Sequence, residues 1–322
     1  MALLSVDNLS VSFVTRNGTN QAVDNVSFSV EERQITAIIG ESGSGKSVSC
    51  YAMLGLVPSP PGRIDGGKAH FQGQDLLALS EDELRAIRGR DITMIFQDPM
   101  TCLNPFMKIG DQLIEPLTLH KGLVKGPARE RAMALLDEVG IRDPQAAMSA
   151  FPHEFSGGMR QRVMIAMALA CQPKLIIADE PTTALDVTVQ AQILSLLKNL
   201  TKEANSSLIL ITHDLGVVAR YADKVAVMYG GRVVETAYAT ELYKNPQHPY
   251  TEGLMASIPK LDGDPGSTLY TIDGQPPDLS NLPSGCSFNP RCPHAQDKCT
   301  MTKPTLAEVA PNHKRACFGY ER

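Results

Sequence analysis

Apolar and polar residues alternate from Leu3 to about Val30, a pattern typical of strands with one buried and one exposed face. The alternation is clear over Leu9–Phe13 and again over Val26–Val30. Between these segments, Arg16-Asn17-Gly18 is a strong hairpin signal. We therefore expect antiparallel strands in the N-terminal part of the chain.

Beyond this region, short unbroken apolar runs alternate with segments of helical period. Buried strands are predicted at Ile35–Ile39, Ile92–Phe96, Lys174–Ala178, Ser207–Thr212 and Lys224–Tyr229, and a further β segment near Lys68–Gln72. Helices are predicted at Ser47–Leu56, Ser80–Arg88, Ala128–Val139, Gln161–Ala170 and Thr188–Ala204, with residues 102–170 forming a helical insertion. Apolar strands separated by helices indicate a parallel sheet covered on both faces. The predicted fold class is α/β.

A glycine-rich loop follows the apolar run Ile35–Ile39. Its sequence, Gly40-Glu41-Ser42-Gly43-Ser44-Gly45-Lys46-Ser47, fits the pattern G-x-x-x-x-G-K-[ST]. Glycines let backbone N–H groups surround phosphate oxygens, Lys46 reaches the β- and γ-phosphates, and the Ser47 hydroxyl coordinates Mg²⁺. The helix predicted at Ser47–Leu56, whose first residues are Ser47 and Val48, adds its positive N-terminal end to the phosphate site. Because the loop lies between a strand and a helix, a nucleotide site is favoured over an ordinary glycine turn.

Two carboxylates, Asp179 and Glu180, end the apolar run Lys174–Ala178. In a phosphate-loop enzyme one carboxylate holds the Mg²⁺ shell and another polarises water, and Asp179 and Glu180 fit these roles in that order. A strand that ends in acidic residues is common, so Asp179 and Glu180 indicate a nucleotide site only in combination with the phosphate loop.

Composition narrows the possible functions. The chain has 43% hydrophobic and 20% charged residues, as ordinary globular proteins do, and 322 residues suggest one large domain with a smaller one. A formal net charge of −5 gives no support to nucleic-acid binding through an overall positive field. No apolar run approaches the ~20 residues that span a bilayer, and the N-terminus has no secretory signal pattern, so we expect a cytosolic protein.

Three further motifs lie in the order found in ATPase subunits of ABC transporters, and the chain resembles that family. They are Gln97 after its strand, Phe155-Ser156-Gly157-Gly158-Met159-Arg160-Gln161-Arg162 at a helix start, and His213 in Ile211-Thr212-His213-Asp214. Taken singly, Gln97 or His213 would be an ordinary polar residue. Their order over about 240 residues makes the resemblance specific.

The resemblance implies a role for each matched residue. Gln97, the Q-loop glutamine, senses the γ-phosphate and contacts the membrane subunits, and Mg²⁺ is held by Ser47, Gln97 and Asp179. Glu180, His213 and Gln97 are the expected catalytic residues. ATP is expected to contact Phe13, Gly40, Glu41, Ser42, Gly43, Ser44, Gly45, Lys46, Ser47, Val48 and Asp179. Phe13 is the candidate for stacking on adenine.

In this family two ATPase domains pair head to tail, so the signature motif of one caps the nucleotide of the other. The partner-site residues implied here are Ser156, Gly157, Gly158, Met159 and, in the D-loop Ala184-Leu185-Asp186, Asp186. The chain therefore supplies half of each composite site.

Residues 246–322 differ in composition from residues 1–245, which we expect to be the ATPase domain with a helical subdomain at about 100–168. Half of the 22 prolines lie from Pro246 onward, and four cysteines follow. The segments Pro246–Thr251, Gly285–Phe288 and Arg291-Cys292-Pro293 resemble the C-terminal extension of the oligopeptide/dipeptide importer subfamily. Members with four such cysteines are held to bind a [4Fe–4S] cluster.

The spacing of the four cysteines does not by itself identify the metal that they would bind. Cys286, Cys292, Cys299 and Cys317 lack the paired C-x₂-C of zinc ribbons, and four thiolates suit a [4Fe–4S] cluster, so the cluster is favoured over Zn²⁺ and over unliganded thiols. In a proline-rich tail with few apolar residues, a metal would close the loops, so a structural role is expected. The nearby His294 and His313 are interpreted as exposed polar residues.

Several functions remain to be weighed. The favoured one is an ATP-hydrolysing subunit of a di- or oligopeptide importer, peripheral on the cytoplasmic face of the bacterial inner membrane. Its implied partners are a second ATPase subunit of the same subfamily in a heterodimer, two transmembrane permeases and an extracytoplasmic solute-binding protein, with no nucleic acid. Alternatives are the same role for nickel chelates, glutathione or opine-like compounds, a non-transport ABC ATPase acting on DNA or the ribosome, and a nucleotide-binding regulatory module.

Overall fold

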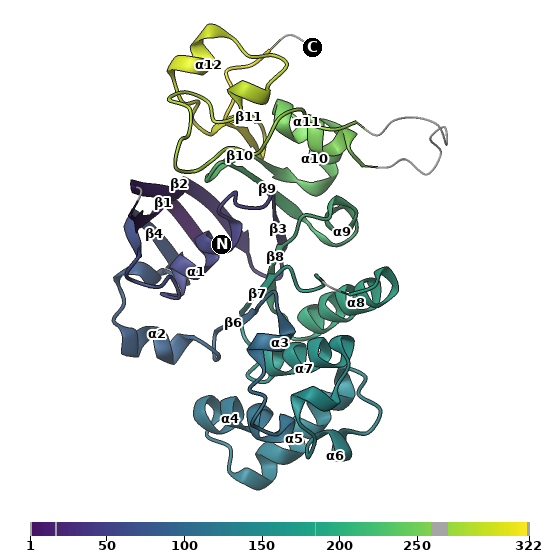
Figure 1. Cartoon of the computed structure of the whole chain (residues 1–322). Helices are drawn as coiled ribbons and strands as arrows, with labels where there is room; N and C mark the ends of the chain where they lie inside the picture. The colour runs from purple at the N-terminus through teal and green to yellow at the C-terminus, as the bar shows by residue number, and fades with distance from the viewer. Residues whose placement is uncertain (1, 17, 184, 259–269, 321–322) are drawn as a thin grey trace. The chain divides into compact units, whose positions relative to one another are not determined.

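The computed structural model describes residues 2–16, 18–183, 185–258 and 270–320. They form two compact units, whose helices and strands are labelled in Figure 1. The first unit comprises residues 1–31, 35–78 and 212–322, and the second comprises residues 32–34 and 79–211.

The N-terminal part of the first unit is an antiparallel sheet. Its strands are β1 (Ala2–Thr15), β2 (Gly18–Glu31), β4 (Gly62–Phe71) and β5 (Gln74–Asp75), in the order β2-β1-β4-β5. Leu4 of β1 lies opposite Val30 of β2 and Phe71 of β4, and all three side chains are buried. The predicted antiparallel strands are thus confirmed, whereas Asn17 of the expected turn lies outside the described residues.

The phosphate loop lies between β3 (Ile35–Ile39) and α1 (Lys46–Met53). β3 pairs in parallel with β9 (Lys224–Tyr229), and β9 pairs antiparallel with β10 (Arg232–Tyr238). β10 continues to β12 (His313–Arg315) and then β11 (Ala307–Ala310). The parallel pair was expected from the sequence, but the antiparallel addition from the end of the chain was not.

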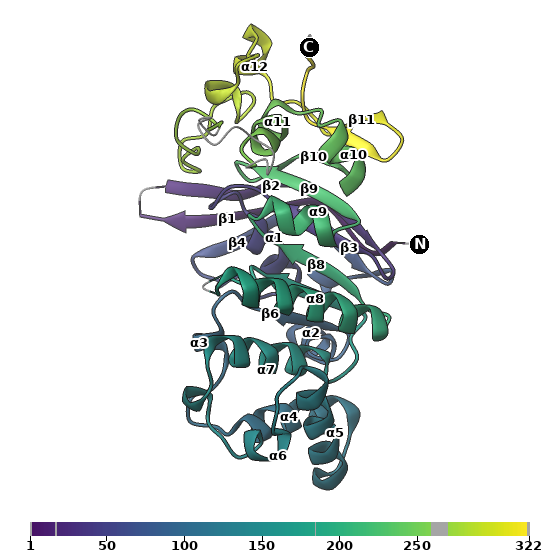
Figure 2. The ribbon, with the colours of Figure 1, turned by 90° about the vertical axis from the view of Figure 1, so that its right-hand side faces the viewer.

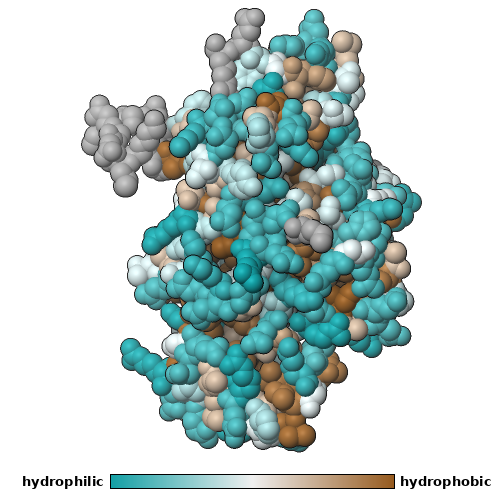
Figure 3. All heavy atoms as spheres, turned by 180° about the vertical axis from the view of Figure 1, so that it is seen from behind, coloured by the Kyte–Doolittle hydropathy of each residue, from teal (hydrophilic) through white to brown (hydrophobic). Residues whose placement is uncertain are grey.

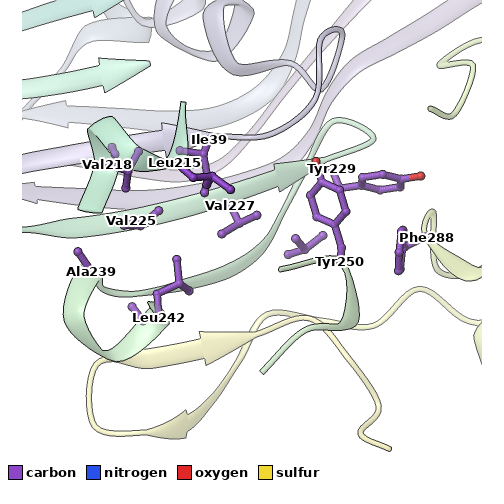
Figure 4. Close-up of a cluster of buried hydrophobic side chains, with 13 residues drawn as sticks. Ile39, Leu215, Val218, Val225, Val227, Tyr229, Ala239, Leu242, Tyr250 and Phe288 are labelled. Atoms are coloured by element: carbon purple, nitrogen blue, oxygen red, sulfur yellow. The ribbon is translucent and has the colours of Figure 1, made fainter. Parts of the chain in front are cut away.

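Short helices complete the first unit. They are α9 (Leu215–Tyr221), α10 (Ala239–Lys244), α11 (Pro249–Ala256) and α12 (Asp297–Met301), with 3₁₀ turns at Leu76–Ala78 and Asn289–Arg291. Side chains from β3, β9, β10, α9, α10 and α11 form one buried cluster, which Phe288 of the tail joins (Figure 4). The proline-rich tail is therefore anchored by apolar contacts with the strands beside the phosphate loop.

The second unit combines three parallel strands with helices (Figure 2). The strands are β6 (Ile92–Ile95), β7 (Leu175–Asp179) and β8 (Ser207–Ile211), in the order β8-β7-β6. The helices are α2 (Glu81–Ile87), α3 (Pro99–Cys102), α4 (Ile109–Lys121), α5 (Lys125–Glu138), α6 (Pro144–Ala147), α7 (Gly157–Leu169) and α8 (Val187–Glu203). These elements confirm the predicted parallel strands and the helical insertion.

The surface seen in Figure 3 is mainly hydrophilic, with hydrophobic side chains in small groups between the polar ones. In the part of the chain that the structure describes, no helix is both long and apolar enough to cross a membrane.

Candidate nucleotide-binding site

The phosphate loop needs its glycines at positions where the backbone passes close to other strands. Gly45 precedes α1 with a φ of +93°, and a Cβ there would lie 2.3 Å from the Ala22 carbonyl oxygen. A Cβ on Gly40 would lie 2.1 Å from the Met228 carbonyl oxygen. Only glycine fits both the conformation and the space. β2 and β9 therefore enclose the loop from the same unit.

The Lys46 ammonium, at the start of α1, lies close to the backbone of the phosphate loop. Lys46 is 5% exposed, and its Nζ donates hydrogen bonds to the carbonyl oxygens of Gly40 at 2.8 Å and Glu41 at 2.9 Å. Ser42 and Gly43 are exposed at the tip. The loop thus combines exposed backbone with a buried ammonium, which is the chemistry that an anionic phosphate group requires.

Two further residues implied by the resemblance belong to the first unit. Phe13 lies on β1 opposite Gly62 of β4 and is half-buried. His213 is exposed in the loop that leads to α9. The next residue, Asp214, caps α9 by accepting a hydrogen bond from the backbone N–H of Val217 at 3.1 Å. This cap fixes the beginning of the helix beside His213.

The second unit brings Gln97 and Glu180 into contact. Gln97 Nε2 donates to Glu180 Oε2 at 3.0 Å, and the Thr183 hydroxyl donates to the same oxygen at 2.9 Å. Glu180 has a φ of +44°, and its N–H donates to the Ile211 carbonyl oxygen at 2.9 Å. The backbone therefore turns sharply after β7, leaving Asp179 buried and the Glu180 carboxylate partly exposed.

The signature and D-loop residues lie at helix starts in the second unit. Ser156 Oγ accepts a hydrogen bond from the Met159 N–H at 3.4 Å and caps α7, and Asp186 caps α8 through the Val189 N–H at 3.0 Å. Ser156 and Asp186 are exposed, whereas Ala184 of the D-loop lies outside the described residues. An exposed helix N-terminus that begins with Ser156-Gly157-Gly158 presents N–H groups and a hydroxyl to an anion.

Comparison with known proteins decides the family. The model for ABC transporters matches residues 23–183, half of the chain. The chain is 53% identical over 317 residues to the Escherichia coli oligopeptide transport ATP-binding protein OppD, covering 98% of this chain and 93% of that protein. The chain belongs to the ABC transporter family. It is an ATPase with the ABC ATPase fold.

Other relatives agree. The Bacillus subtilis dipeptide transport ATP-binding protein DppD is 51% identical over 316 residues, covering 98% of this chain and 94% of that protein. The dimeric structure of the ATP-binding cassette MJ0796 in a post-hydrolysis state with ADP and phosphate has a TM-score of 0.66 at 28% identity, covering 73% of this chain and 98% of that chain. A second model, for the oligopeptide/dipeptide transporter C-terminal region, matches residues 234–299.

The C-terminal region of this ABC ATPase contacts the phosphate loop, which the sequence did not predict. The Glu41 N–H donates to the Tyr250 hydroxyl at 3.0 Å. Arg291 forms two hydrogen bonds with the Glu41 carboxylate, from Nη1 at 2.8 Å and from Nη2 at 3.1 Å. The segments that contain Tyr250 and Arg291 are distinctive in the sequence, but nothing there links them to Glu41, which lies 209 and 250 positions earlier.

Cys286, Cys292, Cys299 and Cys317 line one pocket in the same region of the ABC ATPase. Burial raises the pKa of the Cys286 thiol, and burial together with the neighbouring thiols raises that of Cys292 to about 11. Within the described ranges, no three His, Cys, Asp or Glu side chains are grouped to hold a single metal ion. The expected metal set is thus gathered in one place but does not form a single-ion site.

His313 corrects one expectation. The sequence predicts an exposed side chain, but His313 is 1% exposed, and its ring Nε2 contacts the Glu235 carboxylate at 2.6 Å. His294 is exposed, as expected. Glu235 is buried on β10 and also accepts hydrogen bonds from the backbone N–H groups of Gln247 and His248. His313 is thus a structural partner that joins β12 to β10.

Proposed function

We propose that this chain is the ATP-hydrolysing subunit that powers an ABC importer for di- and oligopeptides. The observation that carries the proposal is the C-terminal region at residues 234–299, which matches the oligopeptide/dipeptide transporter model and follows the ABC transporter match at residues 23–183. The names of the relatives, oligopeptide and dipeptide transport ATP-binding proteins, agree with peptide as the solute. The ATPase domain is taken as residues 1–245 and the extension as residues 246–322.

The proposed site assigns Mg·ATP to the loop of residues 40–48, with adenine on Phe13. Ser47, Gln97 and Asp179 would hold Mg²⁺, whose charge offsets that of the phosphates; oxygen ligands suit this ion. Glu180 would orient and polarise the attacking water, and His213 would contact the γ-phosphate. The hydrogen bonds that Gln97 and Thr183 donate to Glu180 support this assignment because they hold its carboxylate in a defined orientation.

Hydrolysis would require a second ATPase subunit. Ser156 to Met159 and Asp186 of this chain would complete the partner's site, while the partner's signature motif would cap the nucleotide bound here. The dimeric form of the cassette MJ0796 supports this arrangement, as does the exposure of Ser156 at the start of α7. ATP binding would then join the two subunits, and hydrolysis would separate them.

The complete importer would hold a heterodimer of this chain with a second subunit of the same subfamily, on the cytoplasmic face of the bacterial inner membrane. Two transmembrane permeases and an extracytoplasmic solute-binding protein would complete it. The segment after Gln97, residues 98–105, is the proposed docking site for a permease. Because the ATPase does not contact the transported solute in this scheme, a transport experiment identifies that solute.

Reconstitution tests the function. The chain is co-expressed with candidate permeases and a second ATPase subunit of the same subfamily, and ATP-dependent uptake is measured in vesicles with a solute-binding protein. Uptake of di- or oligopeptides supports the proposal. Uptake of nickel chelates, glutathione or opines in place of peptides would change the assigned solute, while the chain would still be the ATPase subunit of an importer. Recovery of the chain alone and bound to nucleic acid would overturn the transport role.

We further propose a [4Fe–4S] cluster at the four cysteines. The four cysteines line one pocket, and four thiolates are the ligands that hold a [4Fe–4S] cluster. Bound iron would stabilise the thiolate forms, because burial, together with the neighbouring thiols, raises the pKa of Cys286 and Cys292. The cluster would supply a covalent link between the loops of the tail. Iron and sulfide analysis with visible absorption tests this, and a colourless, zinc-loaded protein would contradict it.

A further inference from the structure

The contact between the C-terminal region and Glu41 is built like a binding site rather than a surface salt bridge. Arg291 has five N–H donors, and five hydrogen bonds use them. Nη1 and Nη2 donate to both Glu41 oxygens, Nη1 also to the Tyr229 hydroxyl at 3.2 Å, Nη2 to the Ile272 carbonyl oxygen at 3.3 Å, and Nε to the Asp273 carbonyl oxygen at 2.9 Å. The Arg291 side chain is 7% exposed. The guanidinium is therefore fixed in one orientation.

The Glu41 backbone is held as well as its side chain. The Tyr250 hydroxyl accepts the Glu41 N–H, and Tyr250 is itself fully buried with its ring centroid 4.5 Å from that of Tyr229. Figure 4 shows Tyr229, Tyr250 and Phe288 side by side at the end of the apolar cluster. Burial raises the pKa of Tyr229 and Tyr250, so both hydroxyls remain neutral at physiological pH.

Glu41 is the second residue of the phosphate loop, and its carbonyl oxygen accepts a hydrogen bond from Lys46 Nζ at 2.9 Å. The residue is thus fixed at its side chain, its N–H and its carbonyl oxygen. Two of these three contacts come from residues beyond 245. A shift of Tyr250 or Arg291 would move the peptide group that positions the Lys46 ammonium.

We propose that Arg291 and Tyr250 are positioning residues for ATP binding, through which the C-terminal region sets the conformation of the phosphate loop. The inference rests on the phosphate-binding role proposed for residues 40–47. The extension would therefore act on the ATP site through Glu41 of the phosphate loop.

The test measures binding and turnover of Mg·ATP by the full-length chain. Arg291→Met removes the guanidinium group that donates two hydrogen bonds to Glu41. It is expected to raise the Kd and KM for ATP about tenfold while kcat changes less than about twofold. Tyr250→Phe keeps the packing but leaves the Glu41 N–H without its acceptor, and we expect a Kd about threefold higher. Arg291→Lys keeps the positive charge but loses the paired N–H donors of the guanidinium, so its Kd for ATP is expected to lie between those of wild type and Arg291→Met.

Two matched controls separate positioning from general destabilisation. Lys303→Met breaks another ion pair of the tail, with Asp24 at 2.9 Å, and Tyr243→Phe removes a hydroxyl that bonds the Leu215 carbonyl oxygen. Both are expected to keep the wild-type Kd. The double variant Glu41→Gln with Arg291→Met is expected to bind ATP no more weakly than Arg291→Met, because each change breaks the same pair.

The outcomes are distinct. Wild-type Kd in Arg291→Met and Tyr250→Phe, with only a lower melting temperature, would overturn the inference. If Arg291→Met does not fold, Arg291→Lys and Tyr250→Phe provide the decision. If instead Lys46→Ala leaves ATP binding intact, the proposed phosphate site itself fails.

Discussion

Single residues of the phosphate loop are constrained by backbone contacts that a side chain would break. Gly45→Ala would place a Cβ 2.3 Å from the Ala22 carbonyl oxygen at a φ of +93°. We expect a loss of unfolding free energy of about 1–3 kcal/mol and a loss of ATP binding, because the loop must move away from β2. Chemical denaturation and nucleotide titration measure the two effects.

Gly66→Ala is the matched control for Gly45→Ala. Gly66 lies on β4 of the same unit, and a Cβ there has no heavy atom within 4 Å. Both stability and ATP binding are expected to remain near wild type. Equal behaviour of the two variants would contradict the steric explanation.

The carboxylate of Glu180 is expected to act in hydrolysis and not in binding. Glu180→Gln keeps an oxygen that can accept hydrogen bonds from Gln97 and Thr183 but removes the negative charge that polarises water. We expect ATP binding to persist while hydrolysis falls by about 10²- to 10⁴-fold. Single-turnover phosphate release checks this, with Glu203→Gln at the end of α8 as the control. Undiminished turnover would refute the assigned role.

At the scale of elements, α11 begins at a buried histidine that cannot carry a proton without cost. His248 Nδ1 accepts the Tyr250 N–H at 3.1 Å, and burial lowers the pKa of His248 to about 4, with Arg315 adding to the effect and Glu235 opposing it. The unfolded chain, with a His pKa of about 6.5, binds more protons between the two values. Stability should therefore fall as the pH falls from about 6.5 to about 4.

The expected loss from His248 is about 2 kcal/mol between pH 7 and pH 5. Denaturation at the two pH values measures it. His248→Gln should reduce the difference, whatever its own stability, and His294→Gln at an exposed position should not. An unchanged pH dependence in His248→Gln would show that other groups cause the loss.

Pattern and propensity predicted the strands and helices of this chain well where each element has a clear period. β3, β7 and β9 are unbroken apolar runs, and α8 has a regular polar face. β12 (His313–Arg315) could not be predicted, because its three polar residues gain a strand conformation by pairing with β10 and β11. The burial of His313 follows from the same pairing, since its partner Glu235 lies 78 positions earlier.

At the scale of the whole molecule, the sequence predicted the candidate site as separate motifs, because each motif has its own local spacing. The contact of Gln97 with Glu180 joins two such motifs that follow neighbouring strands. The contact of Arg291 with Glu41 joins residues 250 positions apart and has no local signature. Only the packing of the tail beside β9 brings them together.

The proposed pairing of two ATPase subunits predicts a residue that acts only in the assembled molecule. Ser156 is exposed and caps α7, so a test must change its charge without removing the cap. Ser156→Asp keeps a capping oxygen and adds a negative charge that would repel the partner's γ-phosphate, while Ser156→Asn keeps the cap without the charge. Both variants should fold with wild-type stability and bind ATP in their own phosphate loop.

Only Ser156→Asp is expected to block ATP-dependent pairing. Size-exclusion chromatography with ATP, in the Glu180→Gln background and with the second ATPase subunit present, measures the paired fraction. We expect at least a tenfold weaker association for Ser156→Asp than for Ser156→Asn, because a carboxylate close to the γ-phosphate costs more than 1.4 kcal/mol. Equal pairing of the two variants would mean that Ser156 does not face a nucleotide across the subunit interface.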